Sequence, residues 1–125
     1  MKFKQWDCDV KLGQYSNGRL AISLISAESD EDLDIYKGSP IATATVNVPD
    51  IPITSSQVIV KDYSENQGIL KFLQENGFIS EETKIHSLGF VEVHVAQKTA
   101  KLFEMEASQF GDDLKSKVNK KNKIS

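Results

Sequence analysis

The segment WDCDVKLGQYSNGRLAISLI, residues 6–25, sets the fold class, because both of its halves alternate apolar and polar residues. The apolar positions are Trp6, Cys8, Val10 and Leu12 in the first half and Leu20, Ile22 and Leu24 in the second. Period two over this length predicts two strands, each with one buried face.

The turn between these strands fixes their register. A two-residue turn at Asn17-Gly18 would set the apolar positions of one strand opposite polar positions of the other, since a slip of one residue reverses the faces. A three-residue loop over residues 16–18 avoids this mismatch. We therefore predict that Leu12 lies opposite Ile22 and that Gly18 takes the left-handed conformation of a bulged turn.

Three further strands are expected, at residues 40–48, 58–61 and 90–96. Alternate residues from 42 to 48 are apolar, and prolines at 49 and 52 end that strand. Residues 28–39 are too acidic for a core and are expected to form a long loop. The predicted fold class is α+β: a small, mainly antiparallel sheet of about five strands with one helix packed on it.

The helix has a capping signature. Ser64 and Gln67 match a capping box, and apolar residues at helical spacing follow between residues 69 and 73. Gly77 suits the left-handed residue that ends a helix. These signals predict a helix over residues 65–76.

The last part of the chain differs from the body. Residues 1–97 are expected to form one α+β domain, and residues 98–125 a C-terminal extension. Apolar residues at 103, 107, 110 and 114 favour an amphipathic helix there, followed by a disordered Lys-rich tail, with disorder of the whole extension as the alternative. Every charged residue from Leu114 onward is Lys, so an acidic body carries a basic tail.

Composition favours a cytoplasmic protein. The 125 residues are 39% hydrophobic, with a formal net charge of −3. No apolar run is long enough to span a membrane, and residues 1–7 do not resemble a signal peptide. The single cysteine, Cys8, cannot form an intramolecular disulfide, which fits a reducing compartment.

No catalytic, metal or cofactor motif is evident. Cys8, His86 and His94 lack the spacing of a metal site, and Cys8 is expected to be a buried, unreactive thiol. His86 is expected in a loop and His94 on the surface of a strand. Asp7 and Asp9 share one strand face, which is more typical of a solvated surface than of a paired-carboxylate centre. We expect no cofactor, no metal and no enzymatic activity.

A candidate partner-binding site lies at the junction before the helix. The first turn of a helix leaves backbone N–H groups free, and these can hold an anion or a carboxylate. The candidate residues are Lys61, Asp62, Tyr63, Asn66 and Gln67. The alternative is that this junction only caps its own helix.

Several short pieces of the chain form an ordered set. They are FKQW at residues 3–6, NGR at 17–19, PIATATVN at 40–47, KDYSEN at 61–66 and GFV at 89–91. In this order they resemble a family of small uncharacterised bacterial domains, a domain of unknown function often found on mobile genetic elements. The resemblance covers residues 1–97 and implies a shared fold but no activity.

Three functions remain open from the sequence. The first is a non-catalytic binding module of a mobile genetic element acting on a protein partner, with no membrane involved. The alternative is a nucleic-acid accessory protein using the basic C-terminal tail, although an acidic body repels phosphate. The third is a small enzyme with a site at the start of the helix. The acidic loop, residues 28–39, adds a variant of the first function, in which its carboxylates imitate DNA.

Overall fold

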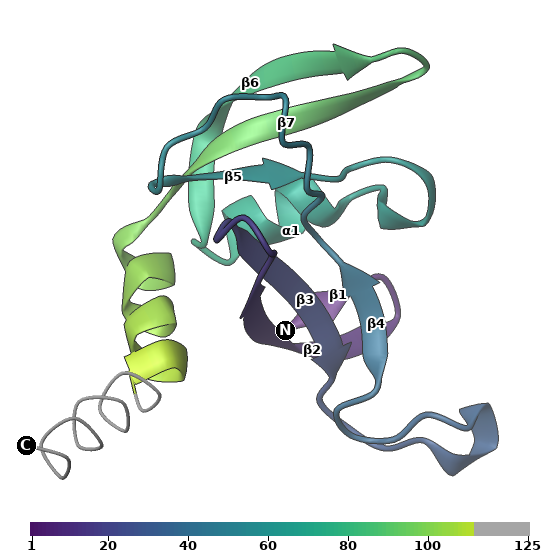
Figure 1. The fold of residues 1–125 in the computed structure, drawn as a ribbon. Helices are drawn as coiled ribbons and strands as arrows, with labels where there is room; N and C mark the ends of the chain where they lie inside the picture. Colours follow the sequence, from purple (N-terminus) through teal and green to yellow (C-terminus); the bar gives the residue numbers. More distant parts are fainter. Residues whose placement is uncertain (112–125) are drawn as a thin grey trace, which may run out of the picture.

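The computed structural model describes residues 1–111, which form an α+β fold with two mainly antiparallel sheets (Figure 1). The first sheet has the order β1-β2-β3-β4 and the second β5-β7-β6. The strands are β1 (Lys2–Phe3), β2 (Trp6–Gln14), β3 (Leu20–Ser26), β4 (Pro40–Thr43), β5 (Gln57–Val60), β6 (Ile79–Leu88) and β7 (Val91–Lys98). The α+β class is confirmed, but the expected single sheet of about five strands is wrong, since residues 1–111 form two sheets with seven strands.

The β2–β3 hairpin has the predicted register. Leu12 lies opposite Ile22, and the whole pairing from Cys8 to Gln14 is regular. Gly18 has φ of 84°, a conformation that costs glycine little. The three-residue loop therefore places the apolar faces of both strands on the same side, as alternation and turn chemistry together require.

The strand expected over residues 40–48 divides into two parts. β4 ends at Thr43, and the chain then crosses to the second sheet, where Thr45 forms a bridge with Val60. Thr45 is buried, and its Oγ1 accepts a hydrogen bond from the Ile22 N–H at 3.1 Å. Buried Thr45 thus links the first sheet to the second at the point where the chain crosses between them. The predicted single strand over residues 40–48 is therefore wrong, because β4 ends at Thr43.

The second sheet contains a strand that was not expected. β6 runs for ten residues beside β7, and the loop position expected for His86 is wrong, because His86 pairs with Val93 inside this hairpin. Phe90, expected to begin β7, lies instead in the two-residue turn.

The helix α1 (Ile69–Glu75) is shorter than the predicted 65–76. Ser64 caps nothing: residues Ser64–Asn66 form a separate 3-10 turn, η2, and Ser64 has a positive φ of 55°. The Asp62 carboxylate instead accepts the N–H groups of Gly68 and Leu70, both at 3.0 Å. The predicted Ser64/Gln67 capping box is therefore wrong, since a carboxylate before η2 performs the capping.

The end of α1 follows the prediction. Gly77 has φ of 77°, and its N–H donates to the Gln74 carbonyl at 3.0 Å. The Phe78 N–H donates to the Leu73 carbonyl at 2.9 Å, which completes a Schellman motif. This cap turns the chain so that the Phe78 ring enters the core.

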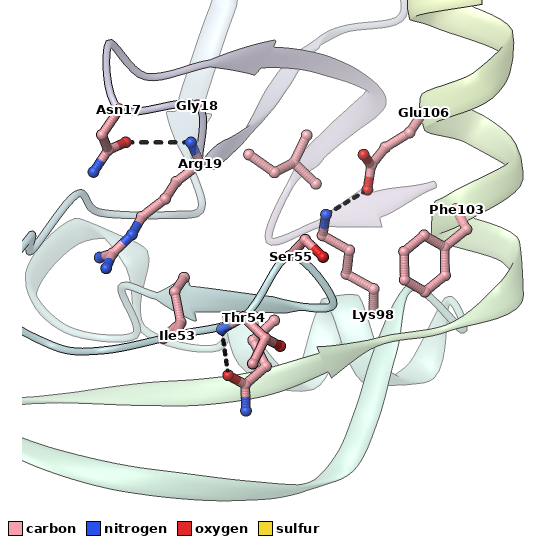
Figure 2. Close-up of a pocket in the computed structure, with 11 residues that line it drawn as sticks. Asn17, Gly18, Arg19, Ile53, Thr54, Ser55, Lys98, Phe103 and Glu106 are labelled. Carbon is pink, nitrogen blue, oxygen red and sulfur yellow. Dashed lines mark hydrogen bonds and ion pairs between the residues drawn. The ribbon is translucent and has the colours of Figure 1, made fainter.

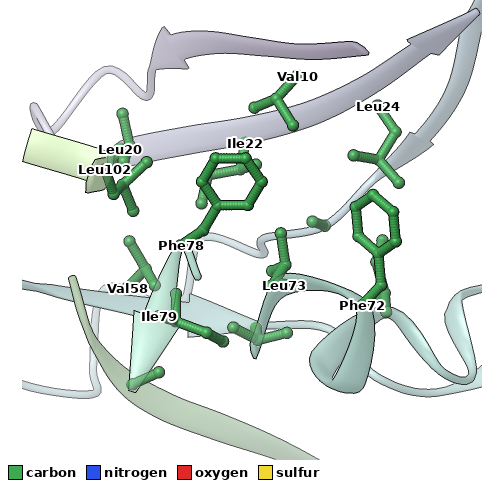
Figure 3. Close-up of a cluster of buried hydrophobic side chains, with 14 of the residues drawn as sticks. Val10, Leu20, Ile22, Leu24, Val58, Phe72, Leu73, Phe78, Ile79 and Leu102 are labelled. Atoms are coloured by element: carbon green, nitrogen blue, oxygen red, sulfur yellow. The ribbon is translucent and has the colours of Figure 1, made fainter. Parts of the chain in front are cut away.

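The main core lies between the first sheet, α1 and one face of the second sheet (Figure 3). Its fully buried side chains include Ile22, Leu24, Leu73 and Phe78. A second cluster on the other face of the second sheet joins Ile51, Ile59, Val93 and Val95. The sheet β5-β7-β6 is thus covered on both faces near β5, and this cover does not extend to the far end of β6 and β7.

The C-terminal extension begins with a helix, and residues 100–111 of it are described (Figure 1). Leu102 is fully buried in the main core, whereas Phe103, the residue expected on the inner face, is 45% exposed. Lys98 and Glu106 form an ion pair at 2.7 Å that joins β7 to this helix. The predicted disordered tail, residues 119–125, lies outside the described residues. Within residues 1–111, no helix has the length and apolar character that crossing a membrane requires.

Candidate functional site

The predicted junction site is largely engaged in holding the fold together. Asp62 caps α1, as described above. Asn66 is 1% exposed, and its Nδ2 donates to the Thr43 carbonyl at 2.6 Å, so it links η2 to β4. Tyr63 is partly buried against the second hydrophobic cluster. These three side chains all contact other parts of the fold. The N–H groups at the start of α1 that were expected to bind a partner already donate to Asp62.

Lys61 and Gln67 remain at the surface of the junction. Lys61 Nζ lies 2.9 Å from Glu65 Oε1 and 5.3 Å from the centre of the Tyr63 ring. The hydrogen bond that Lys61 Nζ donates to the Glu65 carboxylate raises the pKa of Lys61 and lowers the pKa of Glu65. Of the five candidates, the structure brings only Lys61 and Tyr63 together, while Asp62, Asn66 and Gln67 face other parts of the molecule.

Gln67 lies at a shallow basic depression on the neighbouring surface. Lys2, Lys4 and Lys71 line this hollow of about 250 Å³ together with Gln67. Lys4 Nζ donates to the Glu65 carbonyl at 2.8 Å, which ties the first turn of the chain to the junction. All these lysines are exposed, so the depression is a solvated surface rather than an enclosed site.

A hollow of about 470 Å³ lies between the β2–β3 turn, the segment before β5 and the C-terminal helix (Figure 2). The Lys98–Glu106 pair forms one wall, with Phe103 beside it. The Lys98 side chain is 7% exposed and has a full ion-pair partner. Buried pairs of this kind bind elements together when both partners are present, so its evident role is to dock the helix.

Cys8, His86 and His94 are not arranged as a metal site. Cys8 is fully buried in the main core, and this burial raises the pKa of its thiol, which disfavours the reactive thiolate. His94 Nδ1 shares a 3.0 Å hydrogen bond with the Thr83 hydroxyl. Among residues 1–111, no group of three or more His, Cys, Asp or Glu side chains is arranged to hold a metal ion.

The free end of the β6–β7 hairpin has a different character. Ile85 is 55% exposed, Leu88 is 38% exposed and Phe90 is fully exposed. Figure 1 shows this end reaching beyond the other elements of the fold. Three large apolar side chains within six residues therefore lie on one projecting hairpin end, without contact with either hydrophobic cluster.

Sequence reasoning missed this surface because β6 has no clean alternation. Its first residues, SEETK at 80–84, are polar on both faces, so no strand was expected. The available signal was Gly89: two residues, Gly89-Phe90, separate two runs that can pair, and Gly89 has φ of 78°. An aromatic residue directly after that glycine is placed at a turn, and Phe90 is exposed there.

Comparison of the chain with protein-family models, with curated proteins and with solved structures found no match.

Proposed function

We propose that this protein is a non-catalytic binding module that acts on a protein partner in the bacterial cytoplasm, encoded on a mobile genetic element. The observation that carries the proposal is that three large apolar side chains, Ile85, Leu88 and Phe90, are all exposed at the end of the β6–β7 hairpin, with Ile85 and Leu88 on its opposite faces. Exposed aromatic and aliphatic groups gathered on one projection are typical of protein interaction sites.

The charge distribution adds support. The surface near the hairpin end carries both signs, with Glu92, Lys84 and His86 close in sequence to the apolar residues. A mixed polar rim around an apolar centre is the usual composition of a protein interface. Nucleic acid would instead favour a continuous basic surface, and the Lys-rich tail that suggested it lies outside the described residues.

The test replaces Phe90 with a photo-crosslinking phenylalanine analogue in the full-length chain. The variant is irradiated in a nuclease-treated extract of the host cells. We expect one predominant protein adduct, and the adduct should disappear when Ile85 and Leu88 are also changed to serine. The matched control places the same analogue at Leu33, which is 57% exposed on the acidic loop and should give no such adduct.

Two results would contradict the proposal. Equal adducts from positions 33 and 90 would show that any exposed position is labelled. Adducts that appear only before nuclease treatment would favour the nucleic-acid accessory function.

A further inference from the structure

Several strand edges of this protein have specific covers. Gln109 of the C-terminal helix lies along β2: its Oε1 accepts from the Leu12 N–H at 2.9 Å, and its Nε2 donates to the Val10 carbonyl at 3.2 Å. Asn66 covers the Thr43 carbonyl on β4. Covering an edge prevents unwanted pairing with other chains.

The second sheet is covered in the same way at β5 and at the start of β6. The Val46 N–H donates to the Ile59 carbonyl at 3.1 Å on β5. On β6, Gln74 Nε2 donates to the carbonyls of Ser80 and Glu81, at 3.2 and 3.1 Å. A register shift between residues 79 and 83 further disrupts this half of the edge.

The other half of β6 is different. Leu88 and Val91 close a two-residue turn, so their pair is hydrogen-bonded, and the pairs alternate from there. Lys84 and His86 therefore bond to β7. The backbone groups of Thr83, Ile85 and Ser87 point away from β7.

Two hydrogen bonds made by β7 agree with this alternation. The Lys98 N–H donates to the Ser56 carbonyl at 2.8 Å, so even-numbered residues of β7 bond toward β5. The Gln97 N–H donates to Ser80 Oγ at 3.1 Å, so odd-numbered residues bond toward β6. Within residues 1–111, nothing covers the outer backbone groups at 83, 85 and 87.

The side chains beside this open edge define what would fit it. Lys84 and His86 share one face of β6, and the exposed Ile85 lies on the opposite face. A strand added to the edge presents successive side chains to opposite faces. Two of its side chains, two residues apart, would lie beside Lys84 and His86, and the residue between them beside Ile85. The complementary pattern is acidic, apolar, acidic.

We propose that the open half of β6, residues 83–87, binds an extended segment of a different protein that carries this acidic-apolar-acidic pattern, by adding it as a fourth strand to the second sheet. This rests on the proposed function, since it assigns the partner's chemistry at the same hairpin end. Main-chain hydrogen bonds would supply affinity, and the alternate side chains specificity.

Charge argues against the two occupants that the chain itself could supply. Antiparallel pairing with a second copy, centred on Ile85, sets Lys84 opposite His86 of that copy, which gives no acidic partner. The segment from Leu114 to Ser125 carries only lysine charges and has the same sign as Lys84.

The test titrates the full-length, isotope-labelled chain with a capped synthetic peptide that alternates glutamate and valine. Amide hydrogen exchange is followed by NMR. We expect exchange at Thr83, Ile85 and Ser87 to slow by about tenfold or more at saturation, whereas Lys84 and His86 are already bonded and change little. A matched peptide that alternates lysine and valine should have no effect.

Two variants keep the test decisive. The double change Lys84→Glu and His86→Glu should reverse the preference, so that the lysine peptide protects the edge and the glutamate peptide does not. Ile85→Pro removes an outward N–H without removing a bond to β7, as edge strands tolerate. It should abolish peptide binding while the β6–β7 pairing persists in the spectrum.

The proposal is overturned if neither peptide slows exchange at the three outer amides, or if both peptides do so equally. It is also overturned if those amides are already protected in the free protein, either through self-association that grows with concentration or through a cover lost on deleting residues 114–125. A partner adduct at position 90 with no peptide effect would leave the proposed function intact and reject strand addition alone.

Discussion

The two long hairpins of this protein have opposite relations to the rest of the fold. In β2–β3, the inward side chains are buried, Gln109 lies along the outer edge, and the turn is tied down by Arg19. In β6–β7, the base is covered on both faces, but the far end exposes Ile85, Leu88 and Phe90. The inner face of β2–β3 is covered along its whole length, whereas β6–β7 is covered only at its base.

This difference separates stability from binding within a small chain. In a strand pair that is covered on its edge and one face, buried apolar surface and backbone hydrogen bonds stabilise the folded state. A hairpin end that buries little contributes little to folding, and its free backbone and apolar groups remain available to a partner. The contrast predicts that matched changes in the two hairpins will have very different effects.

The largest expected difference comes from one substitution made in each hairpin. Ile22 is fully buried opposite Leu12, so Ile22→Ala should lower the free energy of unfolding by about 3 kcal/mol, from lost burial and the remaining cavity. Ile85 is 55% exposed, and Ile85→Ala should cost less than about 0.5 kcal/mol. Urea unfolding of both variants measures this, and equal losses would remove the contrast.

A smaller effect is expected at the turn of β2–β3. The Arg19 guanidinium donates to the carbonyls of Val48 and Ile51, at 2.8 and 2.7 Å, and so fixes the segment that crosses between the sheets. Arg19→Gln should cost about 2 kcal/mol, because charged hydrogen bonds are lost and their acceptors are left without partners. Lys11→Gln, at an exposed position on β2, is the matched control and should change stability little.

The cap of α1 gives the next effect in size. Asp62→Ala should lower the free energy of unfolding by about 1 kcal/mol, because the N–H groups of Gly68 and Leu70 lose their acceptor. Ser64→Ala should lower it by less than about 0.5 kcal/mol, since Ser64 makes no cap bond. Thermal melts compare the two variants. A larger stability loss for Ser64→Ala than for Asp62→Ala would support the Ser64/Gln67 capping box that the sequence indicated.

The contrast between the hairpins also explains what the sequence could predict. Alternation is informative where one face is buried and the other is wet, which holds for β2 and β3 and gave their register. It fails for β6, because the far end is exposed on both faces and the near end is interrupted by the register shift at residues 79–83. The candidate binding end was therefore missed for the same physical reason that leaves it open.

Other differences arise from contacts between segments distant in sequence. The strand from residue 40 ends at Thr43 because Thr45 bonds to Ile22 and to β5, which local pattern does not reveal. The α1 cap was misplaced because Asp62 reaches it across η2, six and eight residues away. By contrast, Gly77 was correct, since a left-handed helix end depends on neighbouring residues alone.

Native-state hydrogen exchange of the free, full-length protein tests the central claim most directly. The account predicts that the amides of Thr83, Ile85 and Ser87 exchange nearly as fast as in an unfolded chain, while those of Lys84 and His86 are protected. It also predicts that Ile22 and Leu24 exchange only through global unfolding. Protection at Ile85 equal to that at Ile22 would contradict the account, because the end of β6–β7 would then be as enclosed as β2–β3.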